Sequence, residues 1–242
     1  MTTAQSIPRL LLALLSGMAL ASCTIQQSSP TEQQQPADFP TAIYQAAVSD
    51  LAAALTNQLY QLDSGASEIR VKVSRGGLMA ALGHDHIVAS RDTQGFILLD
   101  ELHSSCRADF YAPLNRLIVD EPTMRADANL KTSPSARDIE GTTNNMLISL
   151  DATQFPFVQL GSSDCTDALK GEPIEVTINL HGVSRKQRIN IEMQKEPQAL
   201  TLIGQFSLLQ SDFGIEPFSL FNGLLKVEDK LEIRFRLKAN RL

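Results

Sequence analysis

Apolar and polar residues alternate with a period of two along much of the chain after residue 60. Residues 230–238 show it most clearly, with Leu231, Ile233 and Phe235 between charged neighbours. Successive side chains of a strand point to opposite faces, so this pattern predicts a strand with one buried face. Further strands are predicted at residues 67–74, 95–99, 146–150, 175–181, 188–193 and 200–208, with turns at 76–77, 182–184 and 196–198.

The apolar spacing is different between residues 41 and 59, where it changes to four. The residues concerned are Ile43, Ala47, Leu51, Leu55 and Leu59. A spacing of four is typical of one face of a helix, so a short N-terminal helix is predicted before the strands. Many strands with short connections predict an all-β fold, either an antiparallel barrel or a sandwich. A barrel leaves no free strand edges, and its inner face can enclose a ligand.

The first residues have the order of an export signal. An apolar stretch at residues 10–21 is too short to span a membrane, which takes about 20 apolar residues, but has the length of a secretory signal. The four residues 20–23, Leu-Ala-Ser-Cys, resemble a bacterial lipobox. We therefore expect a signal peptide at residues 1–22 and a lipid on Cys23; an ordinary signal peptide with a chance cysteine is the alternative. Thr24 after the cysteine favours sorting to the outer membrane rather than the inner membrane, facing the periplasm.

Residues 24–40 are rich in Gln, Ser and Pro and contain few large apolar side chains. Such a composition cannot bury a core, so we expect a disordered tether. The predicted organisation is a signal peptide at 1–22, a lipidated cysteine, tether and short helix at 23–58, and a barrel domain at 59–242.

Composition narrows the possible partners and the role of the cysteines. The net charge is −6 and no basic run occurs, so we do not expect the protein to bind nucleic acid. Besides Cys23, the chain has two cysteines, Cys106 and Cys165. In an exported protein, two such thiols favour a disulfide over a metal site or a catalytic site.

From Tyr60 to the C-terminus the chain resembles the YceI family of lipocalin-like β-barrels. The resemblance depends on the order and spacing of several short motifs rather than on any one of them. They are Tyr60–Asp63, Ser67–Ile69, Leu82–His86, Gly95–Phe96, Arg137–Asp138, Asn145–Leu147, Leu150–Asp151, Phe155–Pro156, Leu180–Arg185, Asp212–Ile215 and Lys226–Asp229. Two features depart from the family pattern: Arg137–Asp138 is followed by Ile139–Thr142 rather than by His-Leu, and the cysteine pair is not general to the family.

The resemblance implies a closed antiparallel barrel of about eight strands that binds a long isoprenoid or similar lipid tail. It implies no chemistry on that ligand and no cofactor. The inward sets of the predicted strands are then candidates to line the barrel: Ile69, Val71, Val73, Val176, Ile178, Ile233, Phe235 and Leu237. The alternative is that these side chains fill a solid core.

The histidines offer the other candidate chemistry. His84, Asp85 and His86 follow one another, and His181 lies at the end of a predicted strand. They could close turns, contact a ligand head group, or bind a metal ion. His103 lies beside two serines and is expected at the surface.

Three functions remain open from the sequence. The first is a membrane-anchored periplasmic carrier or sequestering protein for an isoprenoid or other long-chain lipid. The second is a metal- or haem-linked periplasmic enzyme that uses His84, His86 and His181. Against it, Ser184 lacks a Gly-x-Ser-x-Gly setting, so we expect no catalysis. The third is a structural lipoprotein with a filled barrel and no small ligand.

Overall fold

The computed structural model describes residues 35–49, 57–100 and 104–242. The predicted signal peptide, Cys23, the tether as far as residue 34, residues 50–56 of the predicted helix, and His103 therefore lie outside the described residues. The predicted disordered tether is wrong for its last residues, because Pro36 and Phe39 are buried. The predictions about export, lipid attachment and His103 stay predictions. Among the described helices, none is both long enough and apolar enough to cross a membrane.

Within the described residues, thirteen strands form one sheet in which every pairing is antiparallel, so the predicted all-β class is confirmed. The strands are β1 (Asn57–Leu62), β2 (Glu68–Gly76), β3 (His86–Ser90), β4 (Gln94–Asp100), β5 (Ser105–Pro113), β6 (Ile118–Val119), β7 (Phe157–Ser162), β8 (Ile174–Leu180), β9 (Val183–Ile189), β10 (Ile191–Glu196), β11 (Ala199–Leu209), β12 (Ser219–Leu220) and β13 (Leu225–Arg241).

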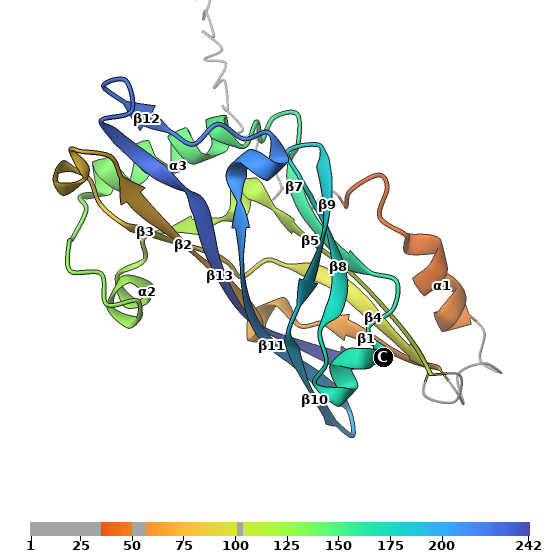
Figure 1. Ribbon diagram of the computed structural model, residues 1–242. Coiled ribbons are helices and arrows are strands. Elements are labelled where there is room, and N and C mark those ends of the chain that lie inside the picture. The colour runs from red at the N-terminus through yellow and green to blue at the C-terminus, as the bar shows by residue number, and fades with distance from the viewer. Residues whose placement is uncertain (1–34, 50–56, 101–103) are drawn as a thin grey trace, which may run out of the picture. The chain divides into compact units, whose positions relative to one another are not determined.

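The long strand β13 organises the sheet. One of its edges pairs with β11 over the whole length of β11, and its other edge pairs first with β2 and then with β1. From β1 the order continues through β4, β5, β7 and β8 to β9, which curves back toward β11 (Figure 1). The sheet therefore wraps around an interior, as expected for a lipocalin-like barrel.

The barrel is not strictly closed, which corrects the expectation of full closure. Strand β9 pairs with β8 as far as Ile189, and β10, from Ile191 onward, pairs with β11 instead. The single strand predicted at 188–193 is thus broken at Asn190, where the chain changes partner. Between β9 and β11 the link is a side chain, because the Gln187 amide donates to the Ser207 carbonyl oxygen at 2.9 Å.

Helices cover parts of this sheet. They are α1 (Thr41–Ser49), α2 (Pro122–Asp127) and α3 (Ala136–Ser149), with short 3-10 turns at η2 (Ser64–Ala66), η3 (Ala80–Leu82), η4 (Leu114–Arg116), η5 (Thr166–Lys170) and η6 (Gln210–Phe213). Helix α1 begins where the predicted N-terminal helix begins. The predicted helix is wrong for residues 57–59, because Leu59 pairs with Leu98 in the sheet.

Helix α1 packs on the outer face of β4 and β5. Phe39 and Tyr44 are buried there against Tyr111, and the Tyr44 ring stacks on Phe96 with centroids 5.0 Å apart. The Tyr44 hydroxyl donates to the Asp109 carboxylate. Burial, and then the hydrogen bond to Asp109, raise the pKa of Tyr44 far above its ordinary value, so this hydroxyl stays protonated.

The strand predicted at residues 146–150 is wrong, because these residues form the end of α3. The start of the helix is fixed by a capping box, in which Ser135 Oγ accepts from the Asp138 amide at 3.2 Å and Asp138 accepts from the Ser135 amide at 2.9 Å. Once the helix starts there, the apolar residues 146–148 belong to its last turns rather than to a strand.

The disulfide between Cys106 and Cys165 lies at the end of the barrel opposite α3. The two Cα atoms are 4.9 Å apart, and the Cys165 amide also donates to the Cys106 carbonyl oxygen at 2.9 Å. Both side chains belong to the main core, beside fully buried residues such as Leu99 and Leu200. This end of the barrel is therefore filled and covalently fastened.

Candidate ligand-binding cavity

The barrel encloses a cavity of about 320 Å³. Its wall is the inner face of the sheet, and its size falls within the roughly 300–1,000 Å³ of ligand pockets in proteins. All eight predicted lining residues contribute to the wall, namely Ile69, Val71, Val73, Val176, Ile178, Ile233, Phe235 and Leu237. The inner residues of β2 are only half-buried. Three of the eight, Val176, Ile178 and Leu237, also belong to the main buried core, so the interior has a packed part as well as a cavity.

Helix α3 contributes one face to the mouth of the cavity. Thr142, Asn145, Met146 and Ser149 all line it. Their spacing of three and four residues places them on one face of the helix. Three of these four side chains are polar, whereas the barrel wall below them is almost entirely apolar, so the mouth is the polar end of the site.

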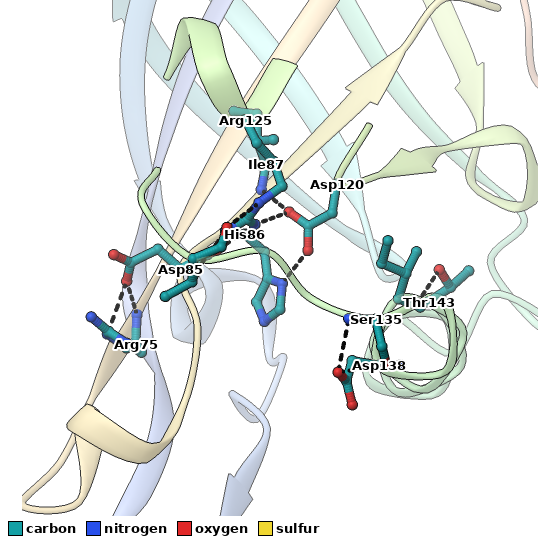
Figure 2. Close-up of polar contacts among 11 residues, drawn as sticks. Arg75, Asp85, His86, Ile87, Asp120, Arg125, Ser135, Asp138 and Thr143 are labelled. Carbon is teal, nitrogen blue, oxygen red and sulfur yellow. Dashed lines mark hydrogen bonds and ion pairs between the residues drawn. The ribbon is translucent and has the colours of Figure 1, made fainter. Parts of the chain in front are cut away.

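His86, at the start of β3, is the ionisable side chain that the described residues contribute to the cavity wall. Its Nδ1 lies 2.6 Å from Asp120 Oδ2. Figure 2 shows that one ring nitrogen faces Asp120 while the other points away from it. Because the carboxylate accepts a hydrogen bond from Nδ1, Nε2 of the neutral ring is left to accept one from a ligand hydroxyl.

Asp120 is held in turn by a buried arginine. Its side chain is fully buried, and Oδ1 accepts from the Ile87 amide at 3.0 Å and from Arg125 at 2.5 Å. Arg125, in α2, also donates to the Asp85 carbonyl oxygen at 2.9 Å and to Thr132 at 2.8 Å. This network ties α2 and the segment after it to the start of β3 (Figure 2).

The network determines the charge state of Asp120. Burial alone would raise the pKa of this carboxyl, but hydrogen bonds from His86, from a backbone amide and from Arg125 stabilise the carboxylate more. The pKa of Asp120 therefore lies below its ordinary value, and the group is ionised at neutral pH. An ionised Asp120 fixes the orientation of the His86 ring.

The other candidate residues of this segment have different surroundings. Asp85 accepts from the Arg75 amide at 3.0 Å, which closes the connection between β2 and β3. The His84 ring lies 6.3 Å from the His86 ring, and its Nδ1 is buried without a hydrogen-bond partner. Asp85 thus has a structural contact, whereas His84 has an unused polar atom close to the mouth.

His181 belongs to a separate part of the structure. With Gly182 it forms a two-residue turn between β8 and β9, in which both residues have positive φ, 54° and 71°. The turn is thus one residue earlier than predicted. His181 Nδ1 lies 3.1 Å from the Phe213 carbonyl oxygen, and the ring packs on Phe155. In the described part of the chain, no three His, Cys, Asp or Glu side chains are placed to hold one metal ion.

Sequence reasoning missed Asp120, Arg125 and the inner face of α3. The face of α3 had a readable signal, because positions 142, 145, 146 and 149 follow helical spacing after the Ser135 cap. Asp120 and Arg125 had none, because Asp120 contacts His86 across more than 30 residues of sequence and Arg125 acts on His86 only through Asp120. Only the paired strands bring these residues together.

Comparisons with known proteins agree with this architecture. The chain shares the fold of a polyisoprenoid binding domain from Saccharophagus degradans, with 12% identity, 76% of this chain and 98% of that chain covered, and a TM-score of 0.54. It also resembles Burkholderia cenocepacia BcnA, with 13% identity, coverages of 73% and 98%, and a TM-score of 0.51. A search of curated proteins finds no match. The YceI-like domain family model matches residues 60–239, and the chain therefore belongs to that family.

Proposed function

We propose that this protein is a periplasmic lipoprotein whose barrel encloses the long apolar tail of an isoprenoid or another lipid. It carries or sequesters that lipid and performs no catalysis on it. The observation that carries the proposal is the cavity of about 320 Å³ with an almost wholly apolar wall. The similarity in fold to a polyisoprenoid binding domain supports it.

Elementary energetics favours such a ligand. Each Å² of apolar surface taken out of water contributes about 25 cal/mol, so a slender tail gains affinity along its whole length. A polar head group cannot enter the apolar part of the cavity without losing its hydrogen bonds to water. We place the head at the mouth, where His86 Nε2 and the polar side chains of α3 can contact it.

The proposed anchor brings the barrel to the source of such lipids. Lipidation of Cys23 with more than one acyl chain gives stable attachment, whereas one chain alone binds weakly. A barrel held at the membrane surface meets lipid tails at high local concentration. Placement in the outer membrane, which the residue after Cys23 favours, is part of this proposal.

Native protein tests the proposal directly. We expect organic extraction of the protein from its own host to release a prenyl or other long-chain lipid in about stoichiometric amount, identified by mass spectrometry. The purified protein should also bind prenyl alcohols of increasing length with increasing affinity. Finding neither an extractable lipid nor binding to any prenyl alcohol would contradict the proposal.

A substitution that fills the cavity provides a matched test. Val71 points into the cavity from β2, so Val71→Phe places a ring where the ligand tail would lie. We expect affinity for a prenyl alcohol, measured by fluorescence competition, to fall by about tenfold or more. Lys72→Phe adds the same ring on the outer face of the same strand and should bind as the unchanged protein does. Equal loss in both variants would show that the ring disturbs the strand rather than the cavity.

The metal- or haem-linked enzyme finds no comparable support. His181 contacts Phe213 in a different turn, and the ring of His86 is engaged by Asp120. Ser90, a hydroxyl-bearing residue of the cavity wall, bonds to Thr93 at 2.9 Å. Among the described residues, no serine or cysteine side chain is hydrogen-bonded to His86, so His86 and Asp120 form only part of a hydrolytic arrangement.

A further inference from the structure

Two neighbouring loops expose large apolar side chains to solvent. The connection between β2 and β3 exposes Leu78, with 93% of its surface accessible, and Leu82. The hairpin between β12 and β13 exposes Phe221, with 63% accessible, together with Leu220 and Leu224. Single exposed apolar residues are ordinary, but a group of them marks a surface that another phase or molecule covers. We call these five residues the rim patch.

The two loops form one surface because their backbones touch. The Met79 amide donates to the Leu224 carbonyl oxygen at 2.8 Å. Gly77 has φ +88°, and a Cβ at that position would lie only 2.4 Å from the same oxygen. The Leu225 side chain in turn lies against Gly83, the residue after Leu82. The rim patch is therefore held together by contacts on both sides of η3.

The rim patch borders the mouth of the cavity. Phe218 and Val227, which flank the hairpin in sequence, both line the cavity wall. Strand β12 and helix α3 lie at the same end of the barrel, opposite β10 (Figure 1). The rim patch therefore lies beside the part of the cavity wall that Phe218 and Val227 form.

We infer that the rim patch docks the mouth of the barrel onto a lipid bilayer, so that a tail passes from the bilayer into the cavity without crossing water. This inference rests on the proposed function. A bilayer fits the rim patch because the membrane that supplies the lipid ligand would then also cover the exposed apolar side chains. Lys226, exposed in the same hairpin, can meet lipid phosphate groups.

The start of the described chain is compatible with this orientation. The Asp38 carboxylate accepts from Gln159 at 3.0 Å, and Gln159 pairs with Tyr111 near the mouth end of β5. The chain between Cys23 and Gln35 spans at most about 40 Å when fully extended. A lipid on Cys23 therefore leaves the mouth within reach of the same membrane.

The sequence contains no tryptophan, which allows a single introduced probe. The test uses the chain from residue 23 onward, with Ser in place of Cys23 so that no lipid anchors it. In Phe221→Trp, we expect a blue shift in emission on adding vesicles of equal parts phosphatidylcholine and phosphatidylglycerol. Brominated acyl chains in those vesicles should quench it. Gln198→Trp, in the turn between β10 and β11 at the opposite end, should show neither effect.

A second variant measures the consequence for transfer. Leu78→Ser, Leu82→Ser and Phe221→Ser together remove the largest exposed side chains of the patch but none that lines the cavity. We expect the rate of prenyl transfer from vesicles to fall by about tenfold or more, with unchanged binding of a short prenyl alcohol offered in solution. Leu169→Ser, an exposed leucine of η5 at the closed end, should transfer at the unchanged rate.

The outcomes separate the two proposals. Binding of the prenyl alcohol without any quenching of the Phe221→Trp probe would overturn the docking inference and leave the proposed function standing. If lipid transfer requires a second protein that covers the rim patch, the docking inference is likewise overturned and the proposed function still stands. Quenching without prenyl binding by the cavity would overturn the proposed function instead. Equal quenching at both tryptophan positions would indicate adsorption without orientation and would also overturn the docking inference.

Discussion

Replacing Asp120 by Asn is expected to lower the free energy of unfolding at neutral pH by about 3–5 kcal/mol. The Asp120 side chain is fully buried, and the Arg125 side chain is 6% exposed. The variant keeps the shape of the carboxylate but removes its charge, which leaves the guanidinium buried without a counterion. Urea unfolding followed by circular dichroism measures the change, read from the midpoint at constant m-value.

A surface ion pair between α2 and β2 provides the matched control. Asp127 lies 3.0 Å from Arg70 and is 61% exposed. Exposed ion pairs contribute about 0–1 kcal/mol, so Asp127→Asn should change stability by no more than that. Equal effects of the two substitutions would mean that burial of the Asp120–Arg125 pair does not set its contribution.

The effect of Asp120→Asn should also depend on pH in a defined direction. The folded-state pKa of Asp120 lies below its unfolded value of about 3.8. A lowered pKa adds stability that is fully present above the unfolded value and is lost as pH falls through the folded value. The difference in stability between the unchanged protein and Asp120→Asn should therefore be largest near neutral pH and shrink below about pH 4. A difference that grows on acidification would contradict this assignment.

The same substitution tests the role of His86 in the cavity. The oxygen of the introduced amide stays with the Ile87 amide and Arg125, so its NH₂ group faces Nδ1 of His86 and donates to it. The ring proton then lies on Nε2, which no longer accepts a hydrogen bond from a ligand hydroxyl. We expect weaker binding of lipids with a hydroxyl head group, and little change for a hydrocarbon of the same length.

Several strands are predicted correctly from the sequence, for different reasons. Residues 230–238 lie within β13, and their inward residues line the cavity. Residues 95–99 and 200–208 lie within β4 and β11, and the predicted turn at 196–198 joins β10 to β11. In residues 230–238 the period of two directly reflects the sheet, because one face lines the cavity and the other carries charged side chains. In β4 the apolar composition alone indicates the strand, because α1 covers its outer face.

The prediction fails where local pattern and tertiary context disagree. Residues 146–148 are apolar in succession, which does not distinguish a strand from the end of a helix, and the Ser135 cap decides for the helix. Strands β3 and β5 were not predicted, because both faces of each are covered in places and the alternation is lost. The break at Asn190 depends on which neighbour each half of the strand meets, and no local pattern records that.

The candidate site was predictable in its apolar part and not in its polar part. The eight lining residues follow from strand periodicity together with the family resemblance, and they share the wall of one cavity. The role of His86 depends on Asp120, which follows β6, and on Arg125 of α2, which holds Asp120 in place. These contacts form only after the sheet has formed. The sequence left open a metal site formed by His84, His86 and His181. The structure places His181 in the turn between β8 and β9, next to Phe213.

Replacing both Cys106 and Cys165 by Ala is expected to lower the free energy of unfolding by about 4 kcal/mol. The disulfide closes a loop between positions 59 residues apart, so it restricts the unfolded chain strongly. Unfolding in urea, with and without a reducing agent, measures the effect. The unchanged protein should lose a similar amount of stability on reduction, whereas the double variant should unfold at the same urea concentration under both conditions.

Because of its location, removing the disulfide is also expected to affect how the barrel holds a ligand. Cys165 also lines the cavity, and Cys106 and Cys165 are buried in the core at the end opposite α3. The disulfide therefore fastens the floor of the barrel while the mouth stays open beside His86. In the double variant we expect faster release of a bound prenyl lipid, because the floor can open in local unfolding at a lower cost in free energy. Unchanged release despite the full loss of stability would show that the ligand leaves only through the mouth and that the disulfide stabilises the fold without retaining the lipid.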